Sequence, residues 1–222
     1  MDKSDEIVIH ISKNMKITVE ELKNGVVSFK EVEPNTFVEC IKSSLKQGMI
    51  CSGVLPDNCV SYSSSEDGNR YVTIVVDEQK SDITYEKTLY EGFPLPRLIF
   101  GFYIDKSGRI YSVNLGVIAK GKVTPETKMY HYPFSNVGGF NLCTGGNSFP
   151  KITSLHQLCG IPNYILSMPN NNDRYEASHN KLRLEFRALL EHLKDKTSDY
   201  YYKNILIESG KKVKDFINWR SI

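Results

Sequence analysis

The sequence has no long hydrophobic run. None of its apolar stretches approaches the roughly 18 residues that a membrane-spanning helix needs. The first residues, MDKSDEIVIHISKN, also lack the apolar core that follows the basic start of a signal peptide. From these two absences we expect a cytoplasmic protein with no membrane partner.

Charge of one sign is also scarce. Lysine and arginine number 28 and aspartate and glutamate 26, so the formal net charge is only +2. Nucleic-acid-binding domains usually carry a basic face or stripe. The short basic run KKVKDF near the C-terminus is more typical of a solvated helix face. We therefore expect no nucleic-acid partner.

Cysteine is sparse, and its spacing has no pattern. The five cysteines are Cys40, Cys51, Cys59, Cys143 and Cys159, and no two form a C-x-x-C pair. An odd number of cysteines in a reducing compartment argues against a disulfide framework, and the spacing of zinc ligands is missing. We expect no metal and no other cofactor. Cys40 and Cys159 lie among apolar residues, which predicts buried side chains.

What is present is the composition of a folded domain, with 40% hydrophobic and 24% charged residues. Near the N-terminus EIVIHI alternates and NGVVSF begins with a hairpin-type Asn-Gly, which predicts β-structure. PNTFVECIKSSLKQG then has a helix start at Pro34 and places Phe37 and Ile41 on one helical face. We predict an N-terminal β extension over residues 1–33 and a second domain over residues 34–222.

Alternating apolar residues dominate the next part of the chain. The polar stretch SYSSSEDGNR predicts a loop, and alternation follows over residues 72–76, 83–89, 98–104 and 111–119. A period of two with short connections predicts an antiparallel β-meander. The preceding helix should pack on one face of this sheet, which makes the fold class α+β.

Helical periodicity returns towards the C-terminus. SHNKLRLEFRALLEHLKD carries one apolar stripe and predicts a helix, and residues 203–219 read as a second helix that breaks near Gly210. Residues 121–152 lie between the meander and these helices. They contain several prolines and two Gly-Gly pairs, which predicts a long ordered loop of functional interest.

Cys143 is the candidate nucleophile in that loop. Gly145 and Gly146 follow it, and glycine permits positive φ and close approach of another backbone. We therefore expect Cys143 to be the most accessible cysteine. Asn136, seven residues earlier, could donate a hydrogen bond to an oxyanion. His131, twelve residues earlier, could instead activate the thiol as in a peptidase.

The order of these features resembles ubiquitin-conjugating enzymes. That family has a helix, a meander and a His-Pro-Asn tripeptide before the nucleophilic cysteine, then further helices; here His131, Pro133, Asn136 and Cys143 follow in that order, although the tripeptide is interrupted. The segments PRLIFGF, TPETKMYHYPFSNV and LCTGGN resemble more closely the prokaryotic family D of this superfamily, which includes protein B of the PRTRC plasmid system.

The resemblance implies a ubiquitin-conjugating-enzyme-like fold and a transferase activity. Cys143 would accept a ubiquitin-like protein as a thioester from an adenylating, ubiquitin-activating-like enzyme and pass it to a target, with Asn136 as oxyanion donor. The resemblance also implies a bacterial operon linked to phage defence, which can encode a metal-dependent deconjugating peptidase.

Two other readings stay open on the sequence. The chain could be a catalytically inactive scaffold or binding module of the same fold, with a structural Cys143. It could also be a small cysteine peptidase that pairs Cys143 with a histidine, and either His131 or His179 could take part. His156 reads as a half-buried helix residue.

Overall fold

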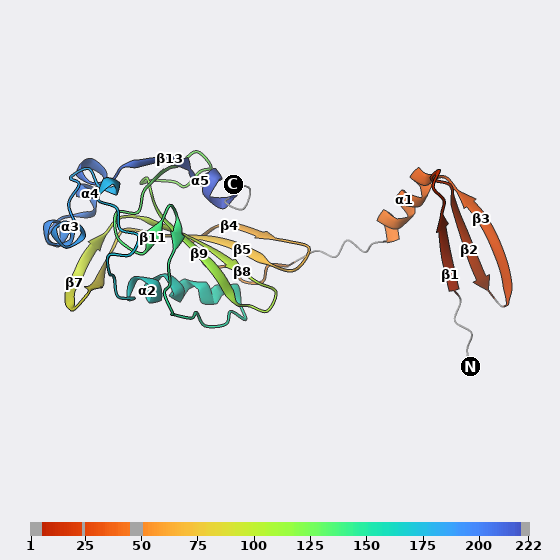
Figure 1. Cartoon of the computed structure of the whole chain (residues 1–222), viewed down its shortest axis with the longest axis horizontal. Coiled ribbons are helices and arrows are strands. Elements are labelled where there is room, and N and C mark those ends of the chain that lie inside the picture. Colours follow the sequence, from red (N-terminus) through yellow and green to blue (C-terminus); the bar gives the residue numbers. More distant parts are fainter. Residues whose placement is uncertain (1–5, 24, 45–50, 219–222) are drawn as a thin grey trace. The chain divides into compact units, whose positions relative to one another are not determined.

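The computed structural model describes residues 6–23, 25–44 and 51–218, and the chain divides into two compact units, residues 1–51 and 52–222 (Figure 1). This boundary differs from the predicted one, which followed residue 33.

The N-terminal unit is a three-stranded antiparallel sheet with one helix. Strands β1 (Glu6–Ile11), β2 (Ile17–Lys23) and β3 (Val26–Val32) lie in that order, and helix α1 (Pro34–Ser44) follows. The predicted helix therefore exists, but its apolar side chains face this sheet. Phe37 and Ile41 share an apolar groove with residues of β1, β2 and β3, so α1 belongs to this unit by contact.

The C-terminal unit is built on an eight-stranded antiparallel sheet. Its main order is β11-β12-β9-β8-β5-β4, while β10 pairs with β9 and β13 pairs with β10. The strands are β4 (Cys59–Ser64), β5 (Arg70–Val76), β8 (Leu98–Ile104), β9 (Ile110–Ile118), β10 (Lys128–Tyr130), β11 (Val137–Gly138), β12 (Asn141–Leu142) and β13 (Glu208–Lys212).

A separate hairpin interrupts this sheet in the sequence. Strands β6 (Gln79–Tyr85) and β7 (Thr88–Leu95) pair only with each other, so β5 pairs with β8 instead of with the next strand along the chain.

The strand predicted over 83–89 is wrong, because Glu86 turns the chain there with a φ of 52°. The loop predicted from residue 61 is partly wrong as well, because β4 extends to Ser64. The α+β class with antiparallel sheets is confirmed.

Short helices complete the C-terminal unit. They are the 3-10 helices η1 (Leu155–Gly160) and η2 (Ala177–His179) and the α-helices α2 (Ile161–Leu166), α3 (Phe186–Leu193), α4 (Ser198–Asn204) and α5 (Val213–Ile217). The apolar stripe predicted for α3 is buried from Phe186 onwards, whereas Leu182 precedes the helix and is exposed. The helix predicted over 203–219 is wrong in its middle, because β13 forms there and pairs with β10.

The core of this unit lies around β8. All seven residues of that strand are buried, because its neighbours β5 and β9 cover both edges and side chains from the helices and the β6–β7 hairpin add to the same core. Tyr201 of α4 is fully buried and donates its hydroxyl to the carbonyl oxygen of Pro94 at 2.6 Å.

Among the helices in the described ranges, none has the length and apolarity to cross a bilayer.

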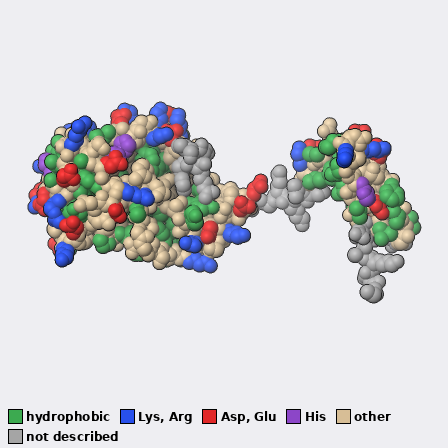
Figure 2. All heavy atoms as spheres, viewed as in Figure 1, with side chains coloured by type: hydrophobic (Ala, Val, Ile, Leu, Met, Phe, Trp, Pro, Cys, Tyr) green, Lys and Arg blue, Asp and Glu red, His purple; other side chains and the backbone are tan. Residues whose placement is uncertain are grey.

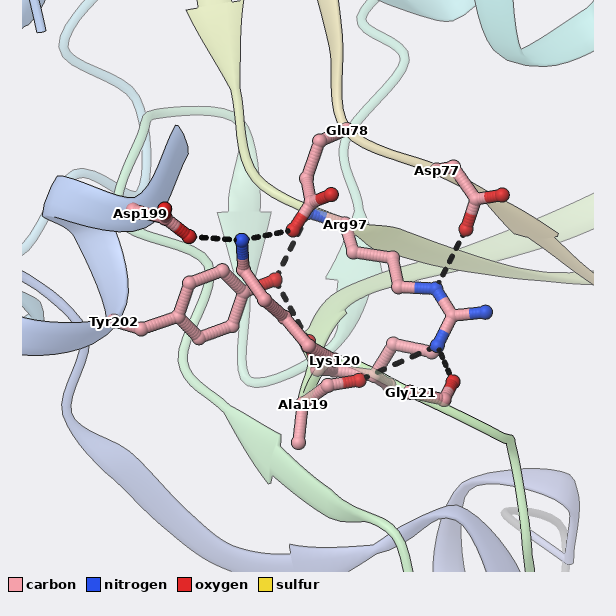
Figure 3. Close-up of polar contacts among 9 residues, drawn as sticks. Asp77, Glu78, Arg97, Ala119, Lys120, Gly121, Asp199 and Tyr202 are labelled. Atoms are coloured by element: carbon pink, nitrogen blue, oxygen red, sulfur yellow. Dashed lines mark hydrogen bonds and ion pairs between the residues drawn. The ribbon is translucent and has the colours of Figure 1, made fainter. Parts of the chain in front are cut away.

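An ion-pair cluster joins α4 to the sheet (Figure 3). The ammonium of Lys120 contacts the carboxylate of Asp199 in α4, and that of Glu78 at 2.9 Å, and these two acids raise the pKa of Lys120. Tyr202 lies beneath, with its ring centroid 5.1 Å from the Lys120 nitrogen. The Tyr202 hydroxyl accepts the backbone N–H of Arg97 at 3.2 Å. The cluster therefore fixes α4 against the ends of β8 and β9.

Candidate functional site

Cys143 directly follows a short hairpin. Strands β11 and β12 pair Val137 with Leu142, and the backbone N–H of Cys143 donates to the carbonyl oxygen of Asn136 at 2.7 Å. Cys143 itself is outside the strand, as the sequence predicts. The hairpin therefore brings Asn136 and Cys143, seven residues apart in the chain, opposite one another.

A depression of about 270 Å³ lies beside these two residues. It is formed by the hairpin base, the Gly-rich turn after Cys143 and the segment that follows α2. The lining residues are Asn136, Cys143, Thr144, Gly145, Asn147, Met168, Pro169, Asn171 and Asp173. A thiol and an amide thus share one concave surface that is open to solvent.

The accessibility of the cysteines differs from the prediction. Cys143 is half-buried, whereas Cys40, Cys51 and Cys159 are exposed. Cys143 is therefore not the most accessible thiol, and the burial predicted for Cys40 and Cys159 is wrong. The apolar neighbours of Cys40 misled the prediction because they line an open groove instead of a closed core.

Asn136 is held in an unusual backbone conformation. Its φ is 65°, in the left-handed region that asparagine tolerates better than most residues. Its backbone N–H donates to the carbonyl oxygen of Asp173 at 2.8 Å, and its side-chain amide donates to that of Pro169 at 3.4 Å. The side-chain bond is long and therefore weak. The amide can leave it to donate to an oxyanion formed in the depression.

His131 lies against another histidine. Its ring stacks on that of His179 with centroids 4.3 Å apart, and His179 lies 3.3 Å from the carboxylate of Glu176. Neither imidazole lines the depression beside Cys143. The structure thus joins His131 to His179 and leaves both away from the thiol.

The structure places a cysteine beside a histidine in η1, away from Cys143. The sulfur of Cys159 lies 4.0 Å from Nδ1 of His156, and both residues are exposed in η1. The spacing of three residues in SLHQLCG is the signal that could have predicted it, since residues three apart in a 3-10 helix lie one above the other. The half-buried position predicted for His156 is wrong.

Burial of His131 leads to a prediction about pH. Burial lowers the pKa of His131, the neighbouring His179 lowers it further and Glu176 opposes both effects. Nδ1 of His131 is buried and has no hydrogen-bond partner within the described residues. A histidine in the unfolded chain has a pKa near 6.5, so the unfolded state binds more protons as the pH falls below about 6.5. Stability should therefore decrease with acidification in that range.

His131→Phe should reduce this pH dependence, because phenylalanine keeps a ring against His179 but takes up no proton. Urea unfolding of the wild type and the variant at pH 7.5 and pH 5.5 measures the difference. His156→Phe, at an exposed position, is the control and should keep the wild-type slope. Equal slopes for all three proteins would contradict the prediction.

The segment that carries Cys143 is fixed at its far end by Gly108. The backbone N–H of Ile152 donates to the carbonyl oxygen of Gly108 at 2.7 Å. Gly108 ends the Asp-Lys-Ser-Gly turn between β8 and β9, where the Asp105 carboxylate accepts two backbone N–H groups. The φ of Gly108 is 88°, and a Cβ atom there would overlap the carbonyl oxygen of Ile152. Only glycine fits this contact.

Gly108→Ala should lower the free energy of unfolding by about 2–5 kcal/mol. Left-handed backbone costs a non-glycine residue about 1–2 kcal/mol, and relief of the overlap costs about 1–3 kcal/mol more. Gly121→Ala is the matched control, because Gly121 has a φ of 92° and open space around its missing Cβ. Urea unfolding checks the difference, and equal losses for the two variants would show that Ile152 does not hold the turn.

The described residues contain no group of three or more histidine, cysteine, aspartate or glutamate side chains that could hold a metal ion. Comparison with protein family models, curated proteins and solved structures finds no significant match for this chain.

Proposed function

We propose that this chain is a ubiquitin-conjugating-like cysteine acyltransferase that carries a ubiquitin-like protein as a thioester on Cys143. The observation that supports it most is the pairing of Cys143 with Asn136 across the hairpin, beside an open depression of about 270 Å³. The segments of the sequence that resemble prokaryotic family D surround the same two residues.

The chemistry consists of two acyl exchanges. In the first, the Cys143 thiolate attacks the thioester that joins the ubiquitin-like protein to its activating enzyme. A new carbon–sulfur bond forms at Cys143 and the activating enzyme's thiolate leaves. In the second, an amine of the target attacks, the Cys143 thiolate leaves and the amine loses a proton to solvent. Each attack passes through an oxyanion, and we assign the Asn136 amide to the oxyanion of the second attack, which it can stabilise by a hydrogen bond.

His131 has no part in this proposed chemistry. It stacks on His179 and does not line the depression, so it acts as a packing residue. The helix that the resemblance places before the meander belongs to the other unit, where α1 packs on β1–β3, so the proposal depends on the segments around Cys143 and not on the whole conjugating-enzyme fold. The peptidase alternative lacks support, because neither His131 nor His179 lines the depression beside Cys143.

The experiment mixes the full chain with ATP, an adenylating enzyme and a ubiquitin-like protein encoded beside its gene. Non-reducing electrophoresis should show an adduct that excess reducing thiol removes, because one thiolate displaces another. Mass spectrometry should place the adduct on Cys143. An adduct on Cys159 would assign the chemistry to the Cys159–His156 pair instead.

A binding module without catalysis is the second candidate, and the half-burial of Cys143 favours it. Alkylation with iodoacetamide separates the two functions. Absence of any adduct, together with alkylation of Cys143 far slower than that of exposed Cys159, would favour the binding module.

A further inference from the structure

The part of the N-terminal unit that the structure describes forms almost no core of its own. Among its described side chains only Ile17 is buried, at 3% exposure. Ten large hydrophobic side chains are exposed, and hydrophobic atoms are conspicuous on its surface in Figure 2. They are Ile7, Val8, Ile9, Ile11, Met15, Val26, Val27, Phe29, Val38 and Ile41. A unit of about 50 residues needs more burial than this to be stable, so another surface must cover part of it.

The uncovered apolar surface includes a groove between β1 and α1. The groove has a volume of about 440 Å³, and its walls are hydrophobic side chains and one thiol. The lining residues are Ile7, Ile9, Val19, Val32, Phe37, Cys40 and Ile41. The register of the sheet places Ile11 beside Ile17 and Val32 on this same face. The three odd-numbered isoleucines of β1 thus form the open border of the groove.

Strand β1 is also the unprotected edge of the sheet. Proteins usually protect an edge strand with lysine, proline or a bulge. Residues 7–11 contain none of these, and their pairing with β2 is regular. The other edge strand, β3, carries Lys30 and Glu31. An outside strand is therefore expected at β1 and not at β3.

The hydrogen bonds of β1 show which peptide groups are available. The backbone N–H of Ser12 donates to the carbonyl oxygen of Lys16, across the turn to β2. Peptide groups alternate in direction along an antiparallel strand. The N–H and C=O groups of Ile7, Ile9 and Ile11 therefore point to the open edge, while their side chains lie on the groove face.

We propose that β1 pairs antiparallel with β1 of a second copy of this chain, around a two-fold axis at Ile9. In this register Ile9 lies opposite Ile9 of the other copy, and Ile7 lies opposite Ile11. Three isoleucines meet three isoleucines, and the available peptide groups of both strands bond one another. A shift by one residue would place apolar side chains on opposite faces. The pattern is therefore complementary to itself, and a closed two-fold pair is the commonest oligomer.

The proposed pairing also covers the groove. It gives a continuous six-stranded sheet with both α1 helices on one face, one on each side of the new seam. Ile41 of each helix, which lines the groove and is exposed in the single chain, then faces the seam from both sides. This assembly forms independently of the chemistry at Cys143.

Light scattering of the full chain across a range of concentrations tests the pairing. The wild type should have about twice the mass of one 25.3 kDa chain. Ile9→Lys places two like charges at the axis and should raise the dimer dissociation constant by more than about 100-fold. Val27→Lys, at a similarly exposed position of β3, is the matched control and should stay dimeric. A wild type that is monomeric throughout would overturn the proposal, as would a dimer that Ile9→Lys leaves intact.

A second measurement does not depend on whether the variant folds. Cys40 lines the groove and is exposed in the single chain, as is Cys159 in the other unit. In the wild type, alkylation of Cys40 should slow as the protein concentration rises, while alkylation of Cys159 stays constant. A constant rate at Cys40 would show that the groove stays open and would overturn the pairing.

Discussion

Replacing Cys143 by serine is expected to abolish the thiol-labile adduct with the ubiquitin-like protein. A serine hydroxyl is a far weaker nucleophile than a thiolate at neutral pH, so the transfer to position 143 should slow by at least about 1000-fold. Any product that does form should be an oxyester and should resist reducing thiol. Cys143→Ala, which has no nucleophile, should give no product at this position.

The matched control for this result is Cys159→Ser. Cys159 is more exposed than Cys143 and has His156 beside its sulfur, so it is the thiol most able to react in place of Cys143. The control should form the adduct at the wild-type rate. Loss of the adduct in Cys159→Ser, with retention in Cys143→Ala, would make Cys159 the nucleophile and remove the proposal for Cys143.

The sequence predicted local structure well where one period dominates a segment. Strands β8 and β9 were predicted because alternating residues flank an Asp-Lys-Ser-Gly turn, and that turn forms as expected. Helix α1 was predicted from its apolar face. Its location was not, because an amphipathic helix can pack on any apolar sheet and the sequence does not say which. Contact with β1–β3 placed it in the N-terminal unit.

Pairing between distant segments was beyond the sequence. Apolar residues alternate over residues 83–89, which predicted one strand. The chain turns between β6 and β7 instead, because Glu86 adopts a positive φ that its residue type does not predict. The segment around Gly210 reads as a broken helix, yet Glu208 and Lys212 pair with β10, about 80 residues earlier in the chain. Such partners contribute hydrogen bonds that outweigh local preference.

The candidate site was predicted in part. The sequence predicted Cys143 on a loop, and Cys143 does lie outside the strands. The backbone hydrogen bond from Cys143 to Asn136 brings the two residues together, while the orientation predicted for the Asn136 amide towards the sulfur stays a prediction. The half-burial of Cys143 was not predicted, because it depends on how the flanking segments fold over the thiol. The stacking of His131 on His179 was also beyond the sequence, since 48 residues separate the two rings.

Removal of the Asn136 side chain should slow the second transfer step without preventing the first. Loss of one oxyanion donor typically costs about 100- to 1000-fold in rate. Asn136→Gly is the variant to use, because glycine accepts the φ of 65° while it removes the amide. Its adduct on Cys143 should form at nearly the wild-type rate, while discharge of the preformed adduct to free lysine should be about 100- to 1000-fold slower.

Two further substitutions separate the amide from the backbone. Asn136→Ala removes the amide and also strains the left-handed backbone, so it should show the same slow discharge and lose about 1–2 kcal/mol of stability as well. Asn136→Asp tolerates the backbone but presents a carboxylate, which accepts hydrogen bonds and repels an oxyanion, so its discharge should be at least as slow as that of Asn136→Gly. If Asn136→Gly discharges like the wild type and only Asn136→Ala is slow, the residue acts by shaping the hairpin beside Cys143 and not by donating a hydrogen bond. Slow discharge in all three variants, with stability lost only in Asn136→Ala, would show that the amide acts on the oxyanion. The backbone conformation is kept in Asn136→Gly and Asn136→Asp, so the slower rate would then come from the missing amide.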